Sequence, residues 1–147
     1  MKIAKFLSLN MTAVIVMSGQ EIERTFRKEL ASFKLSFIDG LVLTAVYFEE
    51  GHLSSPSELT KTFRQSKSNM SHIISRLQTQ KLITRKSSPE DLRSLRVTLT
   101  TNGERVALKL IKIFDRLQSR IEDNNGGEDG VRRLNEKIRR ATKLLSD

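Results

Sequence analysis

The stretch that decides the fold is SSPSELTKTFRQSKSNMSHIISRLQTQKLITRKSSPEDLRSLRVTLTTNG, residues 54–103. It opens with a capping box, in which the Ser55 oxygen accepts a backbone N–H and Glu58 reaches back to the cap. Pro56 occupies the first helical position, where its missing N–H costs nothing. Leu59 and Phe63 then recur at helical spacing. These features predict a short helix with an inward apolar side.

A second helix is predicted directly after a tight turn, with Ser66 as its N-cap. Its buried stripe is formed by Met70, Ile73, Ile74 and Leu77. The opposite face carries only side chains that form hydrogen bonds, namely Lys67, Ser68, Asn69, Ser71, His72, Ser75 and Arg76. A helix with such a face suits the major groove of DNA.

Two strands are predicted next, at residues 82–86 and 95–99, with a loop over 87–94 between them. Arg85 and Lys86 lie on the first strand, and Arg93 lies in the loop. A helix, a turn, a second helix and a basic hairpin together make a winged helix-turn-helix. Leu53 is expected to add one short strand to this sheet.

The segment resembles the MarR family of bacterial transcription regulators. The residues that carry the resemblance are Ser57-Glu58-Leu59, Ser71 to Leu77, Asp91 with Arg93-Ser94, and Leu99-Thr100 with Gly103. The resemblance implies that the second helix reads the major groove. It also implies that Asp91 fixes the wing loop and that Arg93 reaches towards the minor groove.

Two positions depart from the family pattern. Lys81 stands where the family usually has glycine, just after the second helix. A lysine in a left-handed backbone costs roughly 1 kcal/mol, so the helix is expected to end differently here. Leu92 stands where the wing often has a second basic residue, which removes one phosphate contact and leaves Arg93 in place.

The positive charge is concentrated on this segment. The chain has a net charge of +9, and residues 60–96 contain nine Lys or Arg against two acidic residues. Such a footprint favours a nucleic-acid partner over a merely solubilising surface, which usually intersperses both signs. The predicted DNA-binding residues are Ser66, Lys67, Ser68, Asn69, Ser71, His72, Ser75, Arg76, Arg85, Lys86, Asp91 and Arg93.

The segments on either side read as helices. We expect a long first helix over about 5–32, a nearly apolar central helix over 36–50, and a third helix over 101–123 that opens on a Thr101-Asn102-Gly103-Glu104 capping box. An acidic, glycine-rich linker over 122–130 and a last amphipathic helix over 131–145 follow. The fold class is therefore mainly α (α+β), in one domain. Residues 1–35 and 104–147 form a helical dimerisation body, and 36–103 form the DNA-binding lobe.

Several kinds of site are disfavoured. The absence of cysteine excludes a thiol switch, a thiolate zinc site and a disulfide. The two histidines, His52 and His72, lie in different predicted environments and do not suggest a metal site. No nucleophile–base pair, paired carboxylates or phosphate loop indicates an enzyme. The apolar N-terminal run is interrupted by polar residues, and its longest unbroken part, 13–17, is too short to span a bilayer.

These features together predict a cytoplasmic, homodimeric, DNA-binding regulator without a cofactor, whose two winged helices read the halves of a pseudo-palindromic operator. The family resemblance implies a repressor that is relieved by a small aromatic or anionic ligand. The alternative is a winged-helix module that docks on proteins and does not bind DNA sequence-specifically. Such a module would not need Lys67, Arg76, Arg85, Lys86 and Arg93 on one side.

Overall fold

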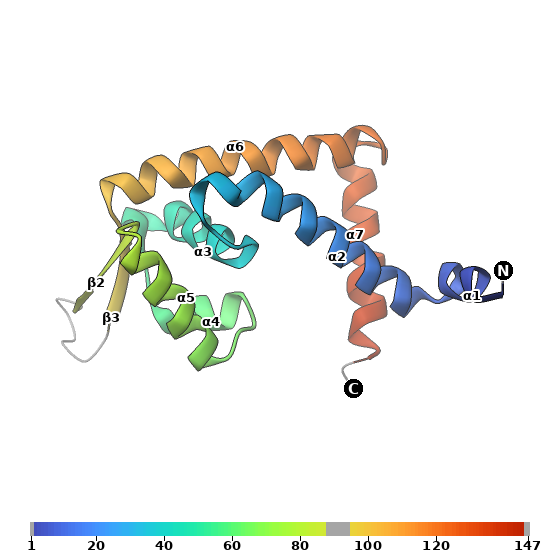
Figure 1. Ribbon diagram of the computed structural model, residues 1–147, viewed down its shortest axis with the longest axis horizontal. Coiled ribbons are helices and arrows are strands. Elements are labelled where there is room, and N and C mark those ends of the chain that lie inside the picture. The colour runs from blue at the N-terminus through green and yellow to red at the C-terminus, as the bar shows by residue number, and fades with distance from the viewer. Residues whose placement is uncertain (1, 88–94, 146–147) are drawn as a thin grey trace. The chain divides into compact units, whose positions relative to one another are not determined.

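The computed structural model of the protein describes residues 2–87 and 95–145 (Figure 1). Contacts along the chain separate into two compact units, Met1–Leu110 and Ile111–Asp147. The described residues are mostly helical and include a small antiparallel sheet of three strands. The predicted fold class, a mainly α winged helix-turn-helix, is confirmed.

The N-terminal segment forms two helices, α1 (Lys2–Leu9) and α2 (Met11–Leu30), followed by a short 3-10 turn, η1 (Ala31–Phe33). The prediction of one continuous helix was wrong, because Asn10 adopts an extended backbone and its side chain accepts a hydrogen bond from the Ala13 N–H at 2.9 Å. Asparagine competes with helix continuation in this way and starts a new helix as its N-cap. Gly19 does not interrupt α2, as expected.

Several large apolar side chains on α1 and α2 are exposed. No single helix among the described residues is long and apolar enough to cross a membrane. In the part of the chain that the structure describes, one pair of helices, α1 with Met11–Phe33, reaches the necessary length and composition, and that pair is bent by 86°.

The central helix is α3 (Phe37–Phe48), preceded by a capping box between Ser36 and Asp39. Val42, Leu43 and Val46 are fully buried in it, which confirms its predicted place in the core. The helix ends two residues earlier than expected, because Glu49 adopts an extended backbone. The 3-10 turn η2 (Glu50–His52) then leads into the sheet.

The winged helix follows as β1 (Leu53–Ser54), α4 (Pro56–Thr62), α5 (Lys67–Thr79), β2 (Ile83–Ser87) and β3 (Leu95–Leu99). The strands are antiparallel in the order β1-β3-β2, with Ile83 opposite Leu99 and Leu53 opposite Thr98. The predicted second strand and the short strand at Leu53 are confirmed, and the first strand is shifted by one residue.

Two helices complete the chain, α6 (Thr101–Asp123) and α7 (Gly127–Lys143). The bounds of α6 are those predicted, but its cap is Thr100 and not Thr101, because the Thr100 hydroxyl accepts the Gly103 N–H at 2.9 Å. The predicted linker was too long. Its acidic residues Glu128 and Asp129 lie in the first turn of α7, where negative charge favours a helix.

Helix α5 ends in a left-handed turn at Lys81, whose φ is 56°. The Lys81 N–H bonds to the Gln78 carbonyl at 2.9 Å and the Leu82 N–H bonds to the Leu77 carbonyl at 3.0 Å. This pair of bonds is the Schellman motif that usually contains glycine. The expectation that lysine would make the helix end differently was therefore wrong. Leu77 and Leu82 are both buried beside the turn, and that burial offsets the cost of the left-handed lysine.

Gly103 allows α6 to start directly against the turn after α5. A Cβ at Gly103 would lie 1.9 Å from the backbone oxygen of Leu82, which no side-chain movement could relieve. The Thr100 N–H bonds to the same oxygen at 3.0 Å. The lack of a side chain at position 103 therefore fixes how closely α6 approaches the root of the wing.

We predict that Gly103→Ala lowers the free energy of unfolding by at least about 2 kcal/mol, since overpacking against backbone forces the two segments apart. Gly19→Ala is the matched control, because a Cβ there meets nothing within 4 Å. That control should gain up to about 1 kcal/mol from helix propensity. Urea unfolding of both variants makes the comparison. Equal stability of the two would contradict the close approach.

Candidate nucleic-acid interface

One face of α5 is exposed, and its other face forms part of the core. Met70, Ile73, Ile74 and Leu77 are each 1% exposed or less, as the predicted stripe requires. Ser66 is the N-cap, and its hydroxyl accepts the Asn69 N–H at 3.1 Å. The outward residues predicted to face DNA are all exposed, namely Lys67, Ser68, Asn69, Ser71, His72, Ser75 and Arg76. They contain donors and short hydroxyls and no acid.

Helix α4 precedes α5 and starts with the predicted capping box. The Glu58 N–H donates to the Ser55 hydroxyl at 3.1 Å, and the Ser55 N–H donates to the Glu58 carboxylate at 2.7 Å. These hydrogen bonds with Ser55 hold the pKa of Glu58 below its ordinary value, and Arg96 at 3.7 Å lowers that pKa further. The box therefore carries a negative charge at the N-terminus of α4, where the helix dipole favours it.

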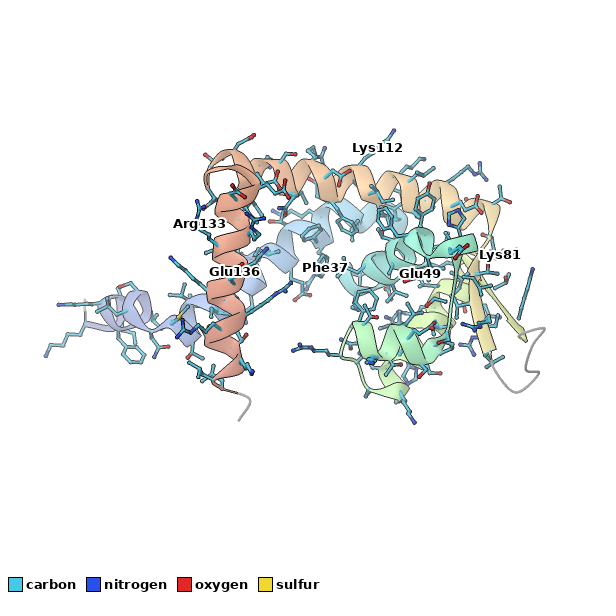
Figure 2. All side chains as sticks on the ribbon, turned by 180° about the vertical axis from the view of Figure 1, so that it is seen from behind. Phe37, Glu49, Lys81, Lys112, Arg133 and Glu136 are labelled. Carbon is cyan, nitrogen blue, oxygen red and sulfur yellow. The ribbon has the colours of Figure 1, made fainter. Side chains whose placement is uncertain are left out.

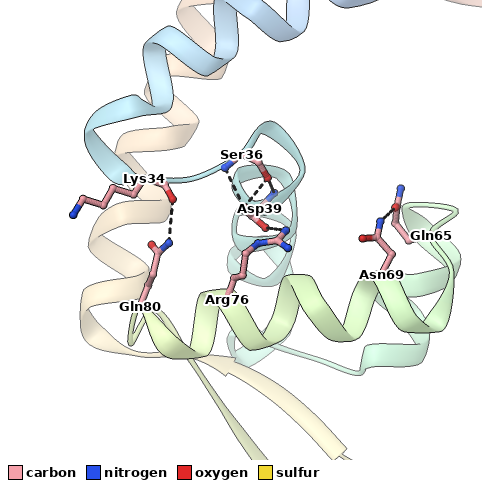
Figure 3. A network of polar contacts seen from close by, with 7 residues as sticks. All are labelled: Lys34, Ser36, Asp39, Gln65, Asn69, Arg76 and Gln80. Atoms are coloured by element: carbon pink, nitrogen blue, oxygen red, sulfur yellow. Dashed lines mark hydrogen bonds and ion pairs between the residues drawn. The ribbon is translucent and has the colours of Figure 1, made fainter.

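Figure 3 shows two predicted DNA-binding side chains, Asn69 and Arg76, that have partners within the protein. The Asn69 amide donates to the Gln65 amide oxygen in the turn before α5. The Arg76 guanidinium donates to the buried Asp39 carboxylate at 2.7 Å. Both side chains therefore have a defined position without a ligand.

The basic strand β2 presents its two cations differently. Arg85 is partly buried, and its Nη2 donates to the Ser75 hydroxyl of α5 at 2.9 Å. Its Nε is buried without a hydrogen-bond partner among the described residues. Lys86 is the next residue along the strand, and its side chain is exposed. Asp91 and Arg93 lie outside the described residues.

A partly open cavity of about 330 Å³ lies beside α5. Its walls are partly apolar, from Pro56, Met70, Ile74 and Leu95, and partly polar or basic, from Ser57, Thr60, Lys67, Ser71 and Arg85. Lys67, Ser71 and Arg85 therefore face both this cavity and the predicted reading surface.

The link between α3 and α5 was missed by the sequence reasoning. Asp39 was not among the predicted site residues, and Arg76 was predicted as a DNA contact. The two residues are 37 positions apart, and nothing local in the sequence indicates the pair. The Gln80 amide also donates to the Lys34 carbonyl at 3.0 Å, another long-range bond without a sequence signal.

The described residues contain no group of three or more His, Cys, Asp or Glu side chains that could hold a metal ion. His52 lies in the turn after α3, where its Nδ1 is 2.6 Å from the Tyr47 carbonyl oxygen and its ring stacks on Tyr47. His72 lies on the exposed face of α5.

Residues 33–94, from η1 to the wing, match the sequence model of the MarR family. This match lies over the winged helix and covers less than half of the chain. The matched range contains every residue that was predicted to contact DNA, including those in the loop between β2 and β3.

Solved MarR-type structures share the fold over nearly the whole chain. The crystal structure of a Staphylococcus aureus MepR–DNA complex has a TM-score of 0.81 at 20% identity, and covers 94% of this chain and 98% of that one. A mutant of Escherichia coli MarR complexed with operator DNA has a TM-score of 0.77 at 20% identity, with 90% and 94% covered. AbsC of Streptomyces coelicolor, a MarR family transcriptional regulator, has a TM-score of 0.76 at 22% identity, with 94% and 97% covered.

The curated relatives agree over a shorter range. The HTH-type transcriptional regulator PrsX, from Escherichia coli and from its strain CFT073, is 24% identical over 88 residues, or 60% of this chain. The match spans about half of those relatives, 53% of their length.

We predict that the contribution of Glu58 to stability depends on pH. Glu58→Gln should lower the free energy of unfolding by less than about 1 kcal/mol near pH 7, since the carboxylate is largely exposed. The folded-state pKa is below the unfolded one. The stabilisation is therefore complete above an unfolded pKa of about 4.3, and is lost as the pH falls through the folded value.

Urea unfolding of wild type and Glu58→Gln over a pH series measures this effect. The difference between the two proteins should narrow towards acid pH. A difference that stays constant over the series would mean that the side chain acts without its charge.

Proposed function

We propose that this protein is a DNA-binding transcription regulator whose α5 helix reads the major groove. The observation that carries the proposal is the charge of the winged helix. Residues 59–89 contain seven Lys or Arg and no acidic residue, and the exposed face of α5 lies within this run. A duplex carries one negative charge for about every 1.7 Å of its axis, so an acid-free basic surface is suited to it.

The comparisons support the same proposal. Two of the proteins that share the fold, MepR and MarR, were solved with DNA, and the latter with its operator. At 20% identity these likenesses establish the fold, and the assignment of DNA as a partner rests on the chemistry of α5 and β2.

The predicted DNA-binding residues divide into two proposed roles. Residues near the start of α5, such as Lys67, Ser68, Asn69 and Ser71, are placed to meet base edges, because a recognition helix usually enters the groove by its N-terminal part. Arg85, Lys86 and Arg93 are proposed phosphate or minor-groove contacts of the wing. Asp91 is proposed to fix the wing loop.

We also propose that the regulator is a homodimer. Apolar side chains on α1 and α2 are exposed in the single chain, among them Ile3 at 52%, Phe6 at 58%, Met11 at 52% and Val14 at 43%. Within the second unit, α7 exposes Leu134 and is followed by the exposed Leu144 and Leu145. A second copy would cover such surfaces, and a two-fold dimer would read a pseudo-palindromic operator.

Repression relieved by a small ligand is a further part of the proposal, and it rests on the family resemblance. The cavity beside α5 supports it, since an aromatic or anionic molecule there would contact Lys67 and Arg85. A cytoplasmic location goes with the proposed DNA partner. The competing function, a docking module for proteins, would leave the basic run without a role.

We predict that Lys86→Ala weakens binding to every duplex. The exposed Lys86 is proposed to bind a phosphate, so its removal should also reduce the slope of the salt dependence by about one unit for each phosphate that it neutralises. Lys112→Ala is the matched control, since Lys112 extends from α6 into solvent (Figure 2) and its removal changes the net charge equally. The control should bind as wild type does.

The same titrations distinguish base reading at Asn69. Asn69→Ala should reduce the preference for a duplex selected by the wild type from a random pool by about 1–3 kcal/mol per half-site, and change random-duplex affinity little. Gln65→Ala is the control, because it removes the hydrogen bond between Gln65 and Asn69 and leaves the Asn69 side chain in place. This variant should retain the preference for the selected duplex. If neither Lys86→Ala nor Asn69→Ala changes DNA binding, the docking module becomes the better assignment.

We predict that Val14→Glu lowers the self-association of the protein at least tenfold, because it places a charge on the apolar face proposed to meet a second copy. Thr12→Glu introduces the same charge at an exposed polar position of the same first turn, and should leave association unchanged. Sedimentation equilibrium measures both. A monomeric wild type, or a Val14→Glu variant that dimerises like the control, would refute this assignment of α2.

A further inference from the structure

The recognition helix is joined to α3 by a buried carboxylate. Asp39 is 3% exposed, and its two oxygens have different partners. Oδ2 accepts the Ser36 backbone N–H at 3.0 Å and the Ser36 hydroxyl at 2.6 Å. Oδ1 accepts the Arg76 guanidinium at 2.7 Å (Figure 3). One oxygen therefore closes the cap of its own helix and the other holds α5.

This bond constrains α5 in a way that its apolar stripe does not. Burial of Met70, Ile73, Ile74 and Leu77 favours the right face of the helix, but apolar contact has no preferred direction. A charge-assisted hydrogen bond is short and directional. A buried carboxylate is also costly to leave unpaired. The bond between Asp39 and Arg76 therefore limits both the rotation of α5 about its own axis and its sliding along that axis.

A second link lies one turn further along α5. Gln80 is four residues after Arg76, and its amide donates to the Lys34 carbonyl at 3.0 Å. Both bonds hold the C-terminal half of the helix to the segment that starts α3. The proposed base-reading residues lie at the other end, around 67–71. If the C-terminal half of α5 moved, residues 67–71 at its other end would change their position in the groove.

Arg76 itself lies at the edge of the core, with 49% of its side chain exposed. It was predicted from sequence to contact DNA, and its position allows two roles. It could contact a phosphate directly, or it could act through Asp39 by fixing the orientation of α5. These roles differ in what they do to random duplex, because a phosphate contact is independent of sequence.

We propose that Asp39 is a positioning residue for operator recognition, and that Arg76 acts through Asp39 and does not read DNA itself. The inference rests on the proposed function, since it assigns how the same reading helix is oriented. It extends the site to a residue on α3 that contacts no DNA. The orientation of α5 then belongs to the specificity of the protein as much as its exposed side chains do.

The test is a double-mutant cycle in the full chain with Asp39→Asn, Arg76→Gln and the double variant. Asparagine at position 39 still accepts the Ser36 N–H, so the cap is retained and the ion pair is removed. The probes are a duplex selected by the wild type from a random pool and an unselected duplex of equal length, each titrated at two salt concentrations. Each single variant should bind the selected duplex about tenfold more weakly.

A positioning role of Asp39 and Arg76 leads to three further expectations. The double variant should lose no more affinity than either single variant, because all three remove the same bond. Binding to the unselected duplex should stay within about twofold of wild type, and the salt slope should be unchanged. If Arg76 contacts phosphate directly, Arg76→Gln would weaken binding to both duplexes, flatten the salt slope and add to Asp39→Asn. That result would overturn the proposal.

Ser36→Ala is the matched control, because it removes a capping hydroxyl from the same carboxylate and leaves Arg76 in place. It should keep the preference for the selected duplex within about twofold. A decrease as large as that of Asp39→Asn would mean that any loosening of α3 has the effect, and would overturn the specific role of the pair. Circular dichroism at the assay temperature establishes that each variant is folded.

The remaining outcomes are also decisive. If Asp39→Asn does not fold, Arg76→Gln alone distinguishes the two roles of Arg76. A positioning role predicts weaker binding to the selected duplex only, whereas a direct phosphate contact predicts weaker binding to both duplexes. A preference that survives both substitutions overturns the inference and leaves the proposed function intact. A wild-type protein that binds all duplexes equally overturns the proposed function before any variant is made.

Discussion

The backbone carbonyl of Leu82 is the point on which the arrangement of the winged helix depends. The Thr100 N–H bonds to it at 3.0 Å, and the Thr100 hydroxyl donates to it and to the neighbouring Lys81 carbonyl at 3.3 and 2.7 Å. Gly103 lies so close that any Cβ would collide with it. The end of α5, the root of the wing and the start of α6 therefore meet at one peptide group. The position of α5 relative to the wing follows from this contact.

Local patterns predicted much of this fold. The capping box of α4, the stripe of α5 and the strand 95–99 each depend on residues within one or two turns of each other, so a single sequence contains the information. The failures were at boundaries that local patterns leave open. Asn10 divides the first helix because its side chain bonds to a backbone N–H, and Thr100 replaces Thr101 as a cap because its hydroxyl also finds the carbonyls before β2.

The sequence predicts which residues form the surface of the candidate site, but not the hydrogen bonds that join them to the rest of the protein. Periodicity shows which residues of α5 face outward, and their exposure agrees with it. It does not show that the Arg76 guanidinium is bonded to Asp39 or that Arg85 donates to Ser75. Such bonds join residues that are distant in sequence, and their geometry exists only after the helices and the sheet have packed. A set of predicted contact residues taken from one helix face therefore includes side chains that are already bonded within the protein.

The strand order has a consequence for the behaviour of the isolated protein. In the order β1-β3-β2, each outer strand has an edge that pairs with no other described strand, and β1 is only two residues long. Exposed edges recruit strands from other molecules, and short edges or cationic side chains discourage this. The outer strand β2 contains the cationic residues Arg85 and Lys86. These cationic side chains discourage the growth of the sheet between molecules, so the residues proposed to bind phosphate also favour the colloidal stability of the free protein.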